Sequence, residues 1–166
     1  MSNIYYVTRK GLNVLTQKLK ELVKDLEKST RAMGHSASLD NDLRENPEFM
    51  QLRTKVTYEL PGKITELERV IRLAKLINDM EHIRNLDLHE VMPGMEVEME
   101  SEDGELRIHS ILGYEEGDPL KGIVSYLSPV GEKLMYKTVG DEVELPMRGK
   151  LVRYEIVNIK LSPYLE

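Results

Sequence analysis

Four carboxylates fall within nine residues of the chain, at Asp40, Asp42, Glu45 and Glu48. Like charges crowded this closely repel one another, so a folded chain tolerates them where water or a cation screens them. Carboxylate oxygens are also ligands that Mg²⁺ takes in proteins. The spacing therefore indicates an exposed acidic segment that could contribute ligands to a divalent cation. The alternative is a set of solvated loop acids.

The segment before these acids has the apolar spacing of a helix that packs against another helix. Thr8 is a suitable N-cap, because its hydroxyl can accept a hydrogen bond from the first helical turn. The pattern extends to about Met33, after which Gly and Ser residues predict a frayed end. The leucines that repeat at alternating steps of three and four, as in a coiled-coil seam, are Leu12, Leu15, Leu19, Leu22 and Leu26.

A second helix is predicted directly after the acids. Asn46 is a good N-cap, and Pro47 takes the first helical position, where a missing N–H does no harm. An apolar pattern then runs from Phe49 to about Ala74, with a slip in its spacing around Pro61. The Pro61 ring removes a donor and crowds a carbonyl, so we expect a kink there, the alternative being a true break. The acids then lie at the tip of an antiparallel hairpin.

The composition changes near residue 80, from helix formers to β-branched residues with Gly and Pro. Alternating apolar and polar residues begin near Val97, and Asp103-Gly104 is a hairpin signal. Ser128-Pro129 predicts the start of one short helix between strands. We expect an α+β chain of two domains: a hairpin at residues 1–80 with its tip at 40–48, a linker at 81–94, and an antiparallel β-domain at 95–166.

The net charge of −6 is unevenly distributed along the chain. Residues 1–80 carry 14 Lys and Arg against 11 Asp and Glu, whereas residues 81–166 carry 9 against 18. This balance is unlike that of a free nucleic-acid-binding protein, which is basic on one face. Without cysteine the chain has no disulfide and no thiolate metal site. No apolar run reaches the ~20 residues of a membrane span, so we expect a soluble cytoplasmic protein without a membrane partner.

Three motifs in this order resemble a known family. They are Asp42-Leu43-Arg44-Glu45-Asn46-Pro47-Glu48-Phe49, then Ser128-Pro129-Val130-Gly131, then Val139-Gly140-Asp141-Glu142-Val143. Together with the helical hairpin and the β-domain, they are similar to those of the bacterial Gre transcript-cleavage factors. The resemblance covers nearly the whole chain. It implies a coiled-coil hairpin followed by a small FKBP-like domain.

The resemblance also implies a partner and an activity. Gre factors dock their β-domain at the rim of the secondary channel of RNA polymerase, and the hairpin brings its tip to the active centre. On the motif match, Ser128 and Pro129 belong to the docking surface, while Asp42 and Glu45 help hold the second Mg²⁺ and the attacking water. The polymerase then cuts its own backtracked RNA. The factor is accordingly no enzyme, and the Mg²⁺ is shared with the polymerase active centre and absent from the free protein.

The sequence allows alternative interpretations of several residues and of the function. Arg44, Arg53 and Lys55 could contact the RNA 3′ end, or could be solvated charges on the hairpin. Glu48 is better suited to favour the helix N-terminus than to bind metal. The main alternative function is an inhibitor that occupies the channel without stimulating cleavage. A peptidyl-prolyl isomerase and a self-associating coiled-coil scaffold are weaker alternatives, since an intramolecular hairpin satisfies the seam and leaves a monomer.

Overall fold

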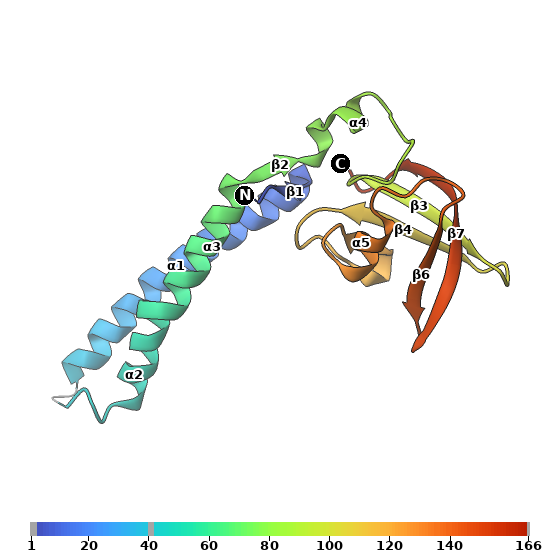
Figure 1. Cartoon of the computed structure of the whole chain (residues 1–166). Coiled ribbons are helices and arrows are strands. Elements are labelled where there is room, and N and C mark those ends of the chain that lie inside the picture. Colours follow the sequence, from blue (N-terminus) through green and yellow to red (C-terminus); the bar gives the residue numbers. More distant parts are fainter. Residues whose placement is uncertain (1–2, 40–41, 166) are drawn as a thin grey trace. The chain divides into compact units, whose positions relative to one another are not determined.

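The structure, a computed structural model, describes residues 3–39 and 42–165 (Figure 1). The chain forms two compact units. One is Asn13–Leu73, and the other joins Met1–Leu12 to Ala74–Glu166. This division differs from the expected domains at 1–80 and 95–166, because both ends of the hairpin segment and the expected linker pack with the β-domain. The α+β class with a helical hairpin and a small sheet domain is confirmed.

The hairpin unit is built from α1 (Arg9–Leu39), lying beside α2 (Pro47–Thr54) and α3 (Leu60–Arg72) (Figure 1). Thr8 caps α1 as expected, since its Oγ1 accepts a hydrogen bond from the Gly11 N–H at 2.9 Å. The expected end near Met33 is wrong, because α1 continues to Leu39. The Ser residues that indicated fraying are accommodated in the helix, and Ser36 is buried there.

The second helix is interrupted by one π-helical turn, η1 (Lys55–Glu59), directly before Pro61. The Leu60 N–H bonds to the Lys55 carbonyl, five residues back, so this turn holds one residue more than an α-helical turn. An inserted residue accounts for the slip in apolar spacing around Pro61. The backbone is irregular beside the residue where a kink was expected, and a bend of the helix axis there stays a prediction. The alternative of a true break is wrong, because helical dihedral angles continue through Leu60.

Two short strands were not predicted. β1 (Tyr5–Val7) pairs in parallel with β2 (Ala74–Leu76), so the chain becomes extended where α1 begins and α3 ends. The expected linker also holds structure, with a 3₁₀ turn η2 (Ile77–Asp79) and a short helix α4 (Glu81–Arg84). Val7 and Ile77 are fully buried, so these segments belong to the core of their unit.

The β-domain is a five-stranded sheet with strand order β5-β4-β3-β7-β6. β5 runs parallel to β4 and the other pairs are antiparallel, so the sheet is mixed rather than purely antiparallel. The one short helix of the expected β-domain is present as α5. The elements are β3 (Met95–Ser101), β4 (Leu106–Leu112), η3 (Pro119–Lys121), β5 (Ile123–Ser125), α5 (Pro129–Leu134), β6 (Glu142–Met147) and β7 (Lys150–Leu161).

The core of the β-domain lies between the sheet and α5. Alternate residues of the strands supply it, as expected for a sheet with one buried face. The buried apolar side chains are Val91, Met95, Val97, Met99, Ile111, Leu134, Val143, Leu145, Tyr154, Ile156 and Ile159. This core places α5 and its preceding loop firmly on the sheet.

Glu116 contacts the start of α1 within the unit that contains the β-domain. Its carboxylate accepts hydrogen bonds from the Thr8 N–H, at 2.9 Å, and from the Thr8 hydroxyl. A side chain at Gly11 or Gly113 would overlap the Glu116 carboxylate, so both glycines leave room for this contact. An acid at a helix N-terminus is favourable, because the first N–H groups of a helix lack backbone partners.

We expect Glu116→Ala to lower the free energy of unfolding by about 2 kcal/mol, because the buried Thr8 N–H loses its acceptor. Glu116→Gln should cost about half as much, since the amide keeps one acceptor oxygen. Urea unfolding measures both changes. The control is Glu102→Ala in the exposed turn between β3 and β4. Equal stability of the Glu116→Ala and Glu102→Ala proteins would contradict this account of the contact.

Candidate functional site

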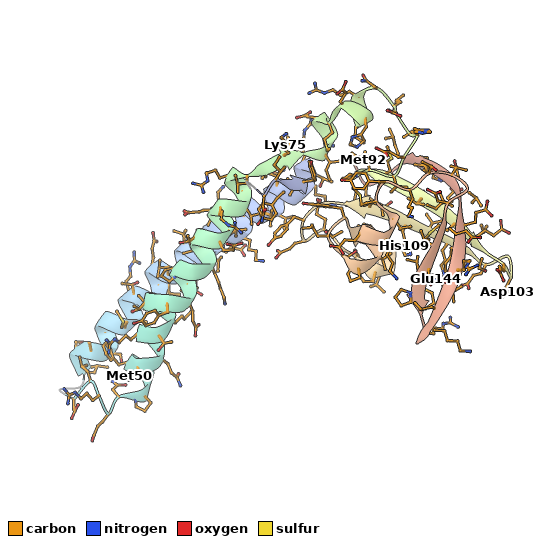
Figure 2. All side chains as sticks on the ribbon, in the orientation of Figure 1. Met50, Lys75, Met92, Asp103, His109 and Glu144 are labelled. Atoms are coloured by element: carbon orange, nitrogen blue, oxygen red, sulfur yellow. The ribbon has the colours of Figure 1, made fainter. Side chains whose placement is uncertain are left out.

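The acidic tip is organised by a tight turn that begins at Asp42. The Asp42 carboxylate accepts a hydrogen bond from the Arg44 N–H at 3.1 Å, and its carbonyl accepts one from the Glu45 N–H at 3.3 Å. An Asp that bonds the backbone two residues ahead is a common way to stabilise a turn. The side chains of Asp42 and Glu45 are both exposed. The structure therefore brings these two predicted residues into one turn between α1 and α2. Met50, labelled in Figure 2, belongs to α2, the helix that follows this turn.

The predicted N-terminus of the second helix is confirmed. The Asn46 side-chain oxygen accepts a hydrogen bond from the Phe49 N–H at 3.0 Å, and Pro47 begins α2. Glu48 stands in the first turn of α2, where its charge favours the helix N-terminus. It also accepts a hydrogen bond from the Ser36 hydroxyl at 3.5 Å. Glu48 is thus engaged within the hairpin.

The donor set of the tip fits a cation that has other ligands as well. Mg²⁺ takes six oxygen ligands and keeps several waters, so two carboxylates complete only part of its shell. Within residues 3–39 and 42–165, no three or more His, Asp or Glu side chains are grouped so that they could hold a metal. Asp42 and Glu45 alone leave most positions of such a shell to other ligands. Asp40 lies outside the described residues.

The three candidate RNA-contacting residues are placed differently. Arg44 is exposed in the tip turn, and Arg53 is exposed in the last turn of α2. Lys55 instead forms an ion pair with Asp25 of α1, with 2.8 Å between Nζ and Oδ1. The bond from Lys55, followed by one from Ser29, holds the pKa of Asp25 below its usual value. Lys55 thus contributes to contact between the helices of the hairpin.

The motif Ser128-Pro129-Val130-Gly131 forms the start of α5. The Ser128 hydroxyl accepts a hydrogen bond from the Gly131 N–H at 3.0 Å and donates one to the Ser125 carbonyl at 2.7 Å. A Cβ on Gly131 would overlap the backbone of Ser125. Pro129 is the first helical residue and its ring is exposed. The Ser128 hydroxyl is therefore used inside the domain, while the Pro129 ring faces outward.

The motif around Gly140 forms a second tight connection. Gly140 has φ of +93°, a backbone conformation that favours glycine. The Asp141 carboxylate accepts a hydrogen bond from the Thr138 N–H at 2.7 Å, and this bond lowers the pKa of Asp141. Leu127, directly before the Ser128-Pro129 motif, is an apolar side chain that is 47% exposed.

Family models match both parts of the chain. One, described as "Transcription elongation factor, N-terminal", matches residues 5–76. The other, described as "Transcription elongation factor, GreA/GreB, C-term", matches residues 86–161. The GreA transcription elongation factor of Chloroherpeton thalassium is 30% identical over 168 residues, an alignment that covers 98% of this chain and all of the relative. The chain belongs to the GreA/GreB family of transcription elongation factors.

Relatives of this Gre-family chain include proteins named GreA and proteins named GreB. The transcription elongation factor GreB of Haemophilus ducreyi is 33% identical over 161 residues, covering 93% of each chain. A solved structure of the transcription factor Gfh1 aligns with 96% of this chain and 99% of its own at 20% identity, with a TM-score of 0.45, too low to support an assignment. No helix among the described residues is long and apolar enough to cross a membrane.

Proposed function

We propose that this Gre-family chain binds RNA polymerase as a monomer, enters its secondary channel and stimulates cleavage of backtracked nascent RNA. The observation that carries the proposal is the tip turn, which exposes Asp42 and Glu45 together at the end of the helical hairpin. The chain acts as an accessory factor, and the cleavage activity belongs to the polymerase. Membership of the elongation-factor family supports the same assignment.

Asp42 and Glu45 would complete the ligand shell of a Mg²⁺ shared with the polymerase active centre. A second metal ion in such a site supplies an activated water and stabilises charge as the phosphodiester is hydrolysed. The protein's part is to present two carboxylates in a fixed arrangement, which lowers the entropy cost of assembling the site. The hydrogen bond from the Arg44 backbone N–H to the Asp42 carboxylate restrains one of those carboxylates before the chain binds the polymerase.

The exposed cations of the hairpin would contact RNA phosphates. Arg44 lies between Asp42 and Glu45 in the sequence. Arg53 lies in the last turn of α2, the helix that follows the tip turn. Both guanidinium groups could bind phosphate oxygens of the RNA 3′ end in a bidentate way. The ion pair with Asp25 makes Lys55 the weakest of the three candidates, because RNA would have to replace that pair.

Docking on the polymerase is assigned to the β-domain at the start of α5. Because Ser128 is occupied by its cap and Pro129 is exposed, Pro129 is the side chain free to contact a partner surface. We expect Pro129→Ala to weaken polymerase binding about tenfold, the effect of losing about 1.4 kcal/mol of contact, while α5 still forms because alanine is a good helix former. A competition binding assay measures the change, and unaltered affinity would remove Pro129 from the docking surface.

The proposed activity is tested with polymerase stalled in a backtracked state on a labelled transcript. Adding the purified chain should shorten the RNA from its 3′ end and allow elongation to resume. The alternative, an inhibitor that occupies the channel, gives a different result. Binding that slows elongation without shortening the RNA would support the inhibitor and overturn the proposed activity.

A further inference from the structure

Ser36 is a buried hydroxyl next to the acidic tip, on the last turn of α1. It is 3% exposed, whereas His35, Ser38 and Leu39 beside it are exposed. A serine near a helix end ordinarily points to water, because its hydroxyl can be satisfied there. Burial of a hydroxyl is favourable only when it has hydrogen-bond partners. The partners of Ser36 lie across the hairpin, on the other helix.

Those partners are two residues at the start of α2. The Asn46 side-chain N–H donates to the Ser36 oxygen at 3.1 Å, and the Ser36 hydroxyl donates to the Glu48 carboxylate at 3.5 Å. Asn46 is at the same time the N-cap of α2, through its bond from the Phe49 N–H. The amide of Asn46 is therefore held at both of its ends. We call the three residues Ser36, Asn46 and Glu48 the tip clamp.

The tip clamp joins the last turn of α1 to the first turn of α2. Asn46 follows Glu45 directly in the chain, so fixing the Asn46 side chain restrains the backbone that carries Glu45. Asp42 is restrained to the same segment by the bonds within its turn. Without the clamp, the turn would remain exposed and acidic but would sample more positions.

We infer that Ser36 is a positioning residue for the acidic tip, acting through Asn46 and Glu48 to hold Asp42 and Glu45 in place. The inference rests on the proposed function for its effect on cleavage. Small displacements of catalytic groups can lower a rate by up to about 100-fold. The inference also gives Glu48 a part within the hairpin, as an acceptor for the Ser36 hydroxyl.

The hydroxyl is tested with two variants of nearly equal shape, Ser36→Thr and Ser36→Val. Any effect of the added methyl group is common to both, so their difference reports the hydroxyl. Ser38→Ala is the control, because within the part of the chain that the structure describes the Ser38 hydroxyl donates to the His35 carbonyl of its own helix and to no residue of α2. We expect Ser36→Val to cleave about tenfold more slowly than Ser36→Thr at saturating factor. The factor concentration for half-maximal cleavage should be equal for both, as should their thermal stability within a few degrees.

A second measurement separates this inference from the proposed function. Hydrogen exchange of the Phe49 amide, which reports the Asn46 cap, should be faster in Ser36→Val than in Ser36→Thr and unchanged in Ser38→Ala. Faster Phe49 exchange in a protein whose wild type stimulates no cleavage would keep the clamp and overturn the proposed function. Equal Phe49 exchange in Ser36→Thr and Ser36→Val would overturn the clamp. A parallel loss of cleavage, polymerase binding and thermal stability in Ser36→Val would reduce Ser36 to a structural role.

Discussion

Asp42→Asn and Glu45→Gln should each reduce stimulated RNA cleavage by roughly 100-fold or more. The neutral amides keep the size of the side chains and one acceptor oxygen. They lose the negative charge that attracts the second Mg²⁺, so the loss is chiefly electrostatic. The measurement is the rate of RNA shortening in backtracked polymerase complexes at saturating factor. Excess Mg²⁺ should restore part of the activity.

The same two substitutions should leave the rest of the protein unchanged. Both side chains are exposed, so the free energy of unfolding should change within about ±0.5 kcal/mol. Polymerase affinity should also remain, because docking is assigned to the β-domain. Asp40→Asn is the matched control and should matter much less. Loss of cleavage in Asp40→Asn but not in Asp42→Asn would show that the wrong acid of the tip has been assigned.

Gly131→Ala should destabilise the β-domain by about 3 kcal/mol, the upper part of the usual range for overpacking. The new Cβ would overlap the Ser125 backbone, which is a strand residue paired in the sheet and cannot move aside cheaply. The Gly131 N–H bond to Ser128 would be disturbed as well. The loss of free energy of unfolding is measured by thermal or urea unfolding, monitored with a spectroscopic signal that comes from the β-domain.

Gly62→Ala is the matched control for this glycine. A Cβ there would meet nothing within 4 Å, and Gly62 lies in α3. Alanine is a better helix former than glycine, so this variant should gain about 0.5–1 kcal/mol. If Gly131→Ala were as stable as wild type, close packing against Ser125 would not explain why the motif at α5 has glycine at this position. A docking role for the glycine would then be the better explanation.

The parts of the fold predicted from sequence are those set by local chemistry. Thr8, Asn46 and Ser128 each cap a helix with a bond that spans three residues, and the residue types alone indicate it. The slip in apolar spacing near Pro61 is likewise local: it marks the segment where the structure has a π-helical turn, although the sequence predicted a kink there rather than this turn. The pairing of Asp42 and Glu45 in one turn is local in the same way.

The parts that were missed depend on contacts between distant segments. β1 and β2 are three residues long and lie about seventy positions apart, so neither has a pattern of its own. Glu116 bonds Thr8 across 108 positions, and nothing near Glu116 indicates a helix terminus. The extension of α1 past Met33 follows from the burial of Ser36 against α2. Tertiary contact there overrides the weak helix propensity of Gly and Ser.

The central claim is that Asp42 and Glu45 help hold the second Mg²⁺ of the polymerase. The most direct measurement is the rate of RNA cleavage in backtracked complexes as a function of Mg²⁺ concentration, with and without saturating factor. We expect the factor to lower the Mg²⁺ concentration for half-maximal cleavage by about tenfold or more, and the double variant Asp42→Asn, Glu45→Gln to leave it unchanged. A factor that raises the maximal rate while leaving that Mg²⁺ concentration unchanged would contradict it.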